Sequence, residues 1–227
     1  MKASERKVLE YRGVYKEIYK SVLIEEELDL IFNDSQIRLN CTMENVEDFI
    51  VGYLFTNSLI NSFDDIKYFN IDKNKVIVKA SKSEKYIKNK SKIAISTKEI
   101  LNSIDTFNST SNLFKKTRSA HSCGLYQGDK IIIFREDIGR HNALDKVIGA
   151  ILRENINLDN SFIYISGRLP LVMVEKLTKV GINIVISLAK PTDLAINYGS
   201  ENNLTIIGDT RKADGFTVYT GFENIIK

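Results

Sequence analysis

The chain has 227 residues, of which 43% are hydrophobic and 27% charged, and its formal net charge is +3. This balance is typical of a globular protein with one large domain, or a domain and a small subdomain, and the mild charge argues against a general nucleic-acid binder. The two cysteines, Cys41 and Cys123, form no Cys-x-x-Cys, which argues against a disulfide framework and a thiolate zinc site.

The beginning of the chain, "MKASERKVLEYRG", has no apolar run that would indicate a signal peptide. No stretch approaches the ~18 apolar residues that a membrane-spanning helix needs. We therefore expect a cytoplasmic protein with neither nucleic acid nor a membrane among its partners.

The first third of the sequence predicts strands and one helix. Residues 20–33 and 35–43 predict a hairpin around Asn33-Asp34-Ser35, and residues 66–72 and 75–80 predict a second hairpin. Residues 45–60 place their apolar side chains on one helical face. Residues 81–95 are rich in lysine and predict a mobile, basic loop close to the ligand cleft.

The next segment predicts a helix and a connector. Ser96 and Glu99 fit a capping box, and Ile100, Ile104 and Phe107 follow on one helical face. Residues 108–119 are polar and predict a connector.

From residue 120 onward, strands and helices alternate. Strands are expected at 120–126, 130–136, 161–166, 182–187, 204–210 and 216–220, and helices at 140–153, 169–180 and 191–200. Near-continuous apolar strands between helices predict an α/β fold with a mixed sheet covered on both faces. We expect two parts: a hairpin-rich subdomain with a helix at 1–110, and an α/β ligand-binding core at 111–227.

Four polar junctions follow predicted strands of this core, at residues 135–141, 166–170, 187–193 and 208–215. In α/β sheets, ligands gather beyond the carboxyl ends of strands, where helix N-termini present N–H groups. The junctions carry Arg140, Arg168, Lys190, Arg211 and Lys212. Guanidinium and ammonium groups suit a phosphorylated ligand. Any one junction alone could be a solvated loop, but four together favour an anion site.

The junction "REDIGRH" is the most polar of the four. We expect Gly139 to permit the turn and Arg140 and His141 to face an anionic ligand. Glu136 or Asp137 is expected to orient the two cations.

The cysteines and His121 leave alternatives open. Cys123 could be a nucleophile whose pKa is lowered by His121 and Lys130, or a small buried strand residue. Cys41 is expected to be structural. The "HSC" segment lacks the Glu of the zinc deaminase motif, and the chain has no P-C-x-x-C, so we expect no metal site.

Several strings resemble one known family. "EDIGRHNALDK" closely resembles the E-D-[VI]-G-R-H-N-A-[VL]-D-K motif of the formate dehydrogenase accessory family (FdhD/NarQ). "SGR" followed by "MVEK", then "KPTDLA", "LTIIGDTR" and "FTVYT", occur in the family's order. "TRSAHS" resembles its T-G-G-x-H segment, and "NVEDFIVGYLFTNSLI" an earlier helix. The resemblance covers roughly residues 40–220.

The resemblance implies a three-layer, cytidine-deaminase-like α/β/α fold without the deaminase zinc, in one family domain of about residues 15–222. It implies a sulfurtransferase that receives persulfide sulfur from a cysteine desulfurase. The sulfur would pass to the molybdenum (or tungsten) bis-guanine-dinucleotide cofactor before insertion into formate dehydrogenase. It also suggests a homodimer, for which "VLIEEELDLIF" would offer an unpaired apolar strand edge.

The junctions and the resemblance together define the candidate site. The candidate catalytic residues are His121 and Cys123, and guanine nucleotides are expected to bind as a fragment of the cofactor. The candidate cofactor-binding residues are Glu136, Asp137, Gly139, Arg140, His141, Ser166, Gly167, Arg168, Pro191, Thr192, Asp209, Thr210, Arg211, Lys212, Ala213, Asp214 and Gly215.

The sequence departs from the family at the sulfur-carrying segment. The family bears its persulfide on a Cys-x-x-Cys, whereas the corresponding residues 86–99 here contain no cysteine. Three hypotheses follow: a sulfurtransferase that uses another thiol, a module that binds the cofactor or guanine nucleotides without moving sulfur, and a nucleotide-processing enzyme on a deaminase-like fold.

Overall fold

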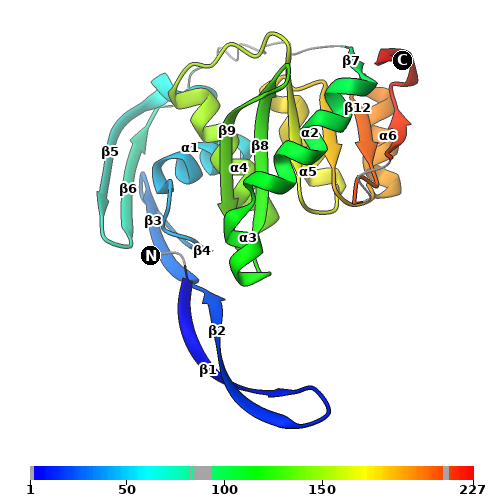
Figure 1. Ribbon diagram of the computed structural model, residues 1–227. Helices are drawn as coiled ribbons and strands as arrows, with labels where there is room; N and C mark the ends of the chain where they lie inside the picture. Colours follow the sequence, from blue (N-terminus) through cyan, green and yellow to red (C-terminus); the bar gives the residue numbers. More distant parts are fainter. Residues whose placement is uncertain (1–2, 82, 84–93, 212–214) are drawn as a thin grey trace.

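A computed structural model describes residues 3–81, 83, 94–211 and 215–227 (Figure 1). Its main sheet has six strands in the order β13-β12-β11-β10-β8-β9. The central strands β10, β11 and β12 are parallel to one another, and β8, β9 and β13 are antiparallel to their neighbours. The predicted mixed sheet is therefore confirmed. The strands are β8 (His121–Gln127), β9 (Lys130–Asp137), β10 (Ser161–Ile165), β11 (Ile184–Ser187), β12 (Thr205–Gly208) and β13 (Thr217–Thr220).

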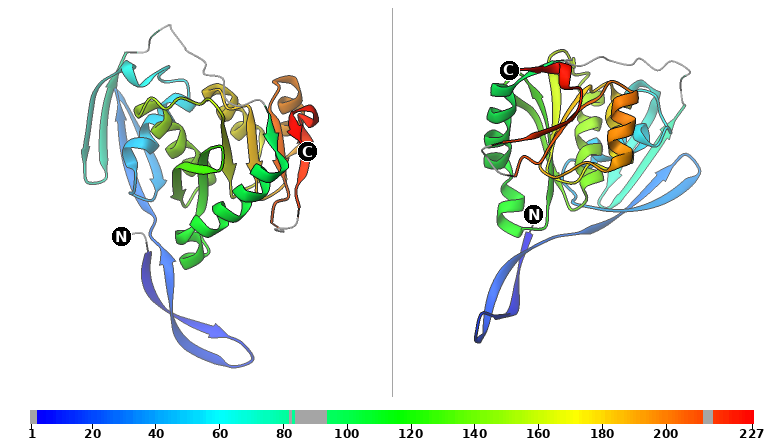
Figure 2. Two further views of the ribbon diagram at one scale, coloured as in Figure 1. Left: turned by 45° about the horizontal axis from the view of Figure 1, so that its top comes forward. Right: turned by 90° about the vertical axis from the view of Figure 1, so that its right-hand side faces the viewer.

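Helices cover both faces of this sheet (Figure 2). On one face lie α4 (Arg140–Arg153), α5 (Leu171–Val180) and α6 (Asp193–Glu201), and on the other lies α2 (Thr97–Thr110). The α2 side chains Ile104 and Phe107 pack with Tyr126, Phe162 and Tyr164 of the sheet in a core separate from that beneath α4 and α5. Alternating sheet side chains thus feed two hydrophobic layers, while the likeness to cytidine deaminases stays a prediction.

A second sheet of four strands, in the order β4-β3-β6-β5, contains both predicted hairpins. Helix α1 (Val46–Thr56) packs against α4, and its Phe49 belongs to one core cluster with Leu28 of this sheet and Leu144 of α4. The division of the chain near residue 110 stays a prediction. The strands are β3 (Glu26–Phe32), β4 (Ser35–Cys41), β5 (Ile66–Asp72) and β6 (Lys75–Ala80).

The N-terminal residues form a hairpin that the sequence did not predict. Strands β1 (Ala3–Tyr11) and β2 (Tyr15–Leu23) pair into an antiparallel hairpin that projects from the body (Figures 1 and 2). Residues 20–23 therefore belong to β2. The prediction of an unpaired strand edge over "VLIEEELDLIF" is wrong, because β3 pairs with β4 on one side and with β6 on the other.

Helix α3 (Asn112–Thr117), which was not predicted, lies within the expected polar connector. The capping box of α2 is confirmed: the Glu99 N–H donates to Ser96 Oγ over 3.2 Å, and the Ser96 N–H donates to the Glu99 carboxylate over 2.9 Å. Short elements complete the fold, namely β7 (Ile95–Ser96), β14 (Ile225–Ile226) and the 3-10 turns η1 (Phe63–Asp65) and η2 (Phe222–Asn224). None of the helices in the described ranges is long and apolar enough to cross a membrane.

Candidate functional site

The four polar junctions lie along one edge of the main sheet. Strands β10, β11 and β12 are parallel, so their carboxyl ends meet at this edge. Strand β8 runs the opposite way, and its beginning reaches the same place, where the Ser166 N–H donates to the Ser122 carbonyl over 3.0 Å. In the antiparallel register of β8 and β9, His121 lies opposite Asp137 at the end of β9. We refer to this edge as the rim.

Arg140 is the first residue of α4 and lies at the end of the rim that is formed by β9 and β8. A Cβ on Gly167 would lie 3.1 Å from Arg140 Cδ and 3.5 Å from His121 Nδ1, so the absence of that atom lets the three residues meet. Within the described ranges, the buried Nε of Arg140 has no hydrogen-bond partner. The first turn of α4 contains no acidic residue, and Gly139 supplies no side-chain cap. A buried donor without an acceptor is costly, and an anionic ligand would supply the acceptor.

His121 and Ser166 form a hydrogen-bonded pair beside Arg140. The His121 Nδ1 lies 3.2 Å from Ser166 Oγ, and the Ser122 N–H donates to the same oxygen over 2.9 Å. Burial, and next the charge of Arg140, lowers the pKa of His121. Burial, followed by the charges of Lys176 and Arg140, lowers the pKa of His141. Both imidazoles are therefore neutral near pH 7, and a bound anion would raise their pKa values.

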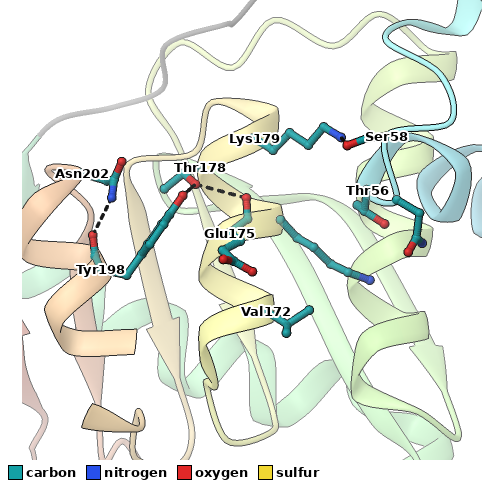
Figure 3. Close-up of a pocket in the computed structure, with 10 residues that line it drawn as sticks. Thr56, Ser58, Val172, Glu175, Thr178, Lys179, Tyr198 and Asn202 are labelled. Atoms are coloured by element: carbon teal, nitrogen blue, oxygen red, sulfur yellow. Dashed lines mark hydrogen bonds between the residues drawn. The ribbon is translucent and has the colours of Figure 1, made fainter. Parts of the chain in front are cut away.

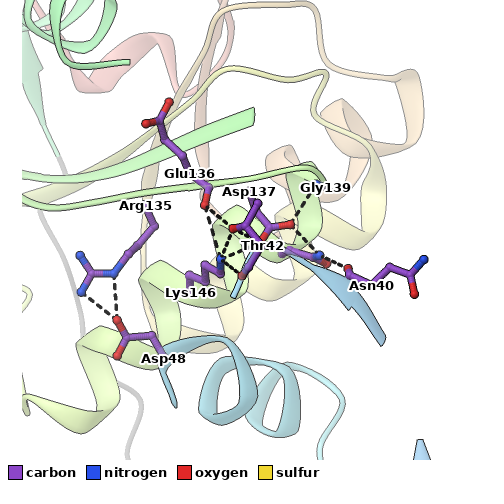
Figure 4. A network of polar contacts seen from close by, with 9 residues as sticks. Asn40, Thr42, Asp48, Arg135, Glu136, Asp137, Gly139 and Lys146 are labelled. Carbon is purple, nitrogen blue, oxygen red and sulfur yellow. Dashed lines mark hydrogen bonds and ion pairs between the residues drawn. The ribbon is translucent and has the colours of Figure 1, made fainter. Parts of the chain in front are cut away.

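The carboxylates of "REDIGRH" have other roles than the sequence suggested (Figure 4). Glu136 accepts hydrogen bonds from the N–H groups of Leu113 and Phe114, over 3.1 and 3.3 Å, and so caps α3. Asp137 is fully buried and lies 2.6 Å from the Lys146 ammonium group. No described contact joins either carboxylate to Arg140 or His141. The expectation that one of them orients those cations is therefore corrected.

Gly139 also differs from its expected role. Its φ of −101° is open to any residue, so the turn does not require glycine for conformational reasons. Instead, a Cβ would lie 3.2 Å from Asn142 Cγ, and Asn142 Nδ2 donates to Asp137 over 2.9 Å. Gly139 leaves room for this contact.

The second junction and the start of the third hold the backbone of the rim in place. Ser187 Oγ donates to the Gly167 carbonyl over 2.7 Å, and Leu169 bridges Pro191. Arg168 is exposed, and Thr192 precedes the first turn of α6 without capping it. These residues are at the rim as predicted, and Arg168 and the N-terminus of α6 face solvent.

The fourth junction is described in part. Thr210 is buried and donates to the Ser187 carbonyl over 3.1 Å, which gives it a structural role. Asp209 has a φ of +60° and accepts from Tyr219 Oη over 2.8 Å. Arg211 is exposed, and nothing lies within 4 Å of a Cβ built on Gly215. Lys212, Ala213 and Asp214 lie outside the described residues.

Both cysteines are buried. The exposed fraction is 0% for Cys41 and 1% for Cys123. Burial raises the pKa of Cys41 to about 12, and burial also raises the pKa of Cys123. A thiol must ionise and be reached by its partner to carry sulfur. The fold therefore favours the structural alternative for Cys123 and presents neither thiol at the rim. Of the lysine-rich loop predicted at 81–95, residues 82 and 84–93 lie outside the described part.

A separate hollow of about 440 Å³ lies between the end of α1 and helices α5 and α6 (Figure 3). Its Lys176 is 2.7 Å from the Asp145 carboxylate, and its Lys179 donates to the Phe55 carbonyl over 2.6 Å. Because these lysines already have partners, the rim is the better anion site. The described residues contain no group of three His, Cys, Asp or Glu side chains placed to hold a metal ion.

Comparison with known proteins gives consistent matches. The model of the FdhD/NarQ family matches residues 23–92 and 79–226. The chain is similar to the "Sulfur carrier protein FdhD" of Listeria innocua, with 31% identity over an alignment of 257 residues that covers 98% of each chain. It is also similar to "Protein FdhD" of Methanocaldococcus jannaschii, with 34% identity over 207 residues and 88% of each chain.

A solved structure has the same fold. It is the crystal structure of a proposed formate dehydrogenase accessory protein from Desulfotalea psychrophila, with a TM-score of 0.89 and 27% sequence identity. The superposition covers 100% of both chains.

Proposed function

Because the chain belongs to the FdhD/NarQ family, we propose that it is a formate dehydrogenase accessory protein that binds the molybdenum bis-guanine-dinucleotide cofactor as cargo at the rim. The names of its relatives support an accessory role, and the chemistry of the rim supports an anionic ligand. Guanine nucleotides such as GDP are the corresponding fragments.

The observation that carries the proposal is the buried Arg140 Nε without a partner. Beside it, His121 and His141 have no described carboxylate contact, so no described carboxylate competes with an added anion for these two side chains. Arg211 lies beyond the end of β12, two strands from β10. At about 4.8 Å per strand, the end of β12 and the end of β10, where the Arg140 side chain packs against Gly167, are roughly 10 Å apart, which suits a ligand with several phosphates.

Sulfur transfer by this chain itself is the second candidate function. It is favoured by relatives named sulfur carrier proteins, including those of Listeria innocua and Bacillus subtilis. Under this function a cysteine desulfurase would be a partner. Two observations weigh against it: both thiols are buried, and the sequence contains no other cysteine. We therefore propose that the chain holds the cofactor and that sulfur reaches it on another molecule.

One experiment separates the two functions. The protein is incubated with a cysteine desulfurase and cysteine, and its intact mass is measured. The proposed function predicts no added sulfur, together with maturation of formate dehydrogenase in cells that lack their own accessory protein. A persulfide that forms on the wild type and disappears in Cys123→Ser would establish the second function instead. Loss of formate dehydrogenase maturation in the single variant Arg140→Ala would support cofactor binding.

A further inference from the structure

The contact between His121 and Ser166 determines where the imidazole ring carries its proton. His121 begins β8 and Ser166 directly follows β10, and the antiparallel pairing of these strands brings the two side chains together. Both residues are half-buried, and Ser166 Oγ lies 3.2 Å from His121 Nδ1. Either atom of this hydrogen bond could be the donor. The choice decides whether the other ring nitrogen, Nε2, is a donor or an acceptor.

The second contact of Ser166 indicates which atom donates. The Ser122 N–H donates to Ser166 Oγ over 2.9 Å, so this oxygen already accepts one hydrogen bond. A hydroxyl has one hydrogen to donate, and among the described residues its acceptor is His121 Nδ1. If Nδ1 carried the proton, the hydroxyl hydrogen would have no described acceptor. A bare Nδ1 satisfies both groups, as half-buried polar atoms require.

The other ring nitrogen of His121 reaches solvent. Among the side chains that the structure describes, Arg140 Nε is the one nitrogen or oxygen that is fully buried without a partner. Because no described hydrogen bond involves His121 Nε2, this atom is accessible at the rim. A Cβ on Gly167 would lie 3.1 Å from Arg140 Cδ and 3.5 Å from His121 Nδ1, so both residues border Gly167. Each offers a ligand at this place one nitrogen without a described partner.

The surroundings of the ring keep it neutral. Burial, and next the charge of Arg140, lowers the pKa of His121. A neutral imidazole carries one proton, so a bare Nδ1 places that proton on Nε2. A carboxylate or carbonyl beside Nδ1 would hold the proton there and leave Nε2 as an acceptor, which repels an anion. A hydroxyl can donate instead, and it therefore suits a histidine that has to bind an anion.

We infer that Ser166 is a positioning residue of the rim, whose hydroxyl donates to His121 Nδ1 and holds the ring proton on Nε2. The neutral imidazole then offers an N–H donor to a phosphate oxygen of the cargo. Ser166 acts through His121, which differs from the direct cofactor contact expected from the sequence. The use of this donor for the cargo rests on the proposed function, whereas the position of the proton does not.

The same pair accommodates a charged ring. When the pH falls, Nδ1 gains a proton and donates to the second lone pair of Ser166 Oγ. The proton on Nε2 is unchanged, so His121 is a donor in both charge states. The hydrogen bond from His121 to a bound anion therefore persists at alkaline pH, where a bare Nε2 would offer none.

Nitrogen NMR of the free protein tests the position of the proton. The chain contains two histidines, so His141→Gln protein leaves the signals of one ring. At pH 8 the protonated and the bare nitrogen resonate far apart, and the protonated one should be Nε2. Ser166→Ala should move the two resonances toward each other, because a fraction of the rings then carries the proton on Nδ1. Ser166→Thr keeps the hydroxyl and should restore the original spectrum.

Two spectra would contradict the inference. A proton on Nδ1 in protein that retains Ser166 would reverse the direction of the hydrogen bond. Unchanged resonances in Ser166→Ala would give Ser166 a structural role alone. The matched control is Ser122→Ala, which removes a hydroxyl that donates to Glu136 and keeps the N–H that donates to Ser166. Its spectrum should equal that of the unaltered ring.

Calorimetry with GDP at pH 8 tests the use of this donor. Ser166→Ala should weaken binding roughly two- to tenfold, the range for one hydrogen bond, and Ser166→Thr and Ser122→Ala should retain the affinity. In the NMR spectrum, GDP should shift Nε2 more than Nδ1. If the unaltered protein bound no GDP while Nε2 carried the proton, the proposed function would fail and the role of Ser166 in the ring would stand. Full affinity in Ser166→Ala would overturn the inference and leave the rim as the anion site.

Discussion

Gly52 of α1 and Gly149 of α4 lie against each other where the two helices cross. A Cβ built on Gly52 would lie 1.8 Å from the Asp145 carbonyl oxygen, and one on Gly149 would lie 1.8 Å from the Asp48 carbonyl oxygen. Neither backbone can accept a side chain without moving the helices apart. This crossing fixes α1, and the small sheet behind it, against the helix that begins with Arg140.

Replacing either glycine should therefore destabilise the fold. Gly52→Ala or Gly149→Ala should lower the free energy of unfolding by about 3 kcal/mol, the cost of overpacking a tight core. Urea denaturation measures the change. Gly215→Ala, where nothing lies within 4 Å of the added Cβ, is the control and should cost much less. Equal losses of stability in all three variants would contradict the claim that the α1–α4 crossing requires glycine.

The buried ion pair Asp137–Lys146 should contribute far more to the free energy of unfolding than a surface ion pair does. Lys146→Met leaves the Asp137 carboxylate buried with its charge uncompensated and should cost about 3–5 kcal/mol. The same substitution at Lys7, whose pair with Glu17 is exposed, should cost less than about 1 kcal/mol. Chemical denaturation of both variants checks this, and a small loss in Lys146→Met would contradict the role given to the pair.

Local patterns predicted much of the fold. Helix α4 occupies the predicted residues Arg140–Arg153, because a polar junction precedes a clear apolar face. The hairpin of β1 and β2 was not predicted, because its strands alternate charged and aromatic residues and do not pack against a hydrophobic core. Helix α3 was missed because its cap, Glu136, lies more than twenty residues away in sequence.

The location of the site was predicted better than the roles of its individual residues. Alternation of strands and helices correctly brings Arg140, Ser166 and Asp209 to one edge of the sheet. The roles of Glu136 and Asp137 depend on non-local partners, α3 and Lys146, which no local pattern reveals. The proximity of Lys176 to His141 likewise arises from the packing of α5 beside α4.

The buried thiols give a direct chemical prediction. In the native protein, Cys41 and Cys123 should not react with a thiol reagent at pH 8, because burial raises both pKa values and blocks access. In denaturant both should react, which serves as the control. Titration with a chromogenic disulfide reagent counts the thiols. Rapid reaction of one thiol in the native protein would restore it as a candidate sulfur carrier.

Anion binding should be linked to proton uptake. Burial lowers the pKa values of His121 and His141 in the free protein, and a bound anion would raise them. Affinity for GDP should therefore rise as the pH falls from 8 to 6. The free protein should lose stability over the same range, because its unfolded state binds more protons. Calorimetry in two buffers of different ionisation enthalpy measures the uptake.

The matched control for this linkage is the double variant His121→Gln, His141→Gln. It should bind GDP with an affinity that changes less with pH, leaving only the titration of the nucleotide itself. A pH profile identical to that of the wild type would show that neither histidine senses the ligand.

The central claim is that the rim holds an anionic cofactor around Arg140, and calorimetry with GDP tests it most directly. Arg140→Ala should weaken binding by about 1.5–3 kcal/mol, or roughly ten- to 150-fold, and Arg211→Ala should do the same at the other end of the rim. Arg38→Ala, which removes an exposed arginine of the small sheet, should leave the affinity unchanged. Wild-type affinity in both rim variants, or no binding of GDP by the unaltered protein, would contradict the account.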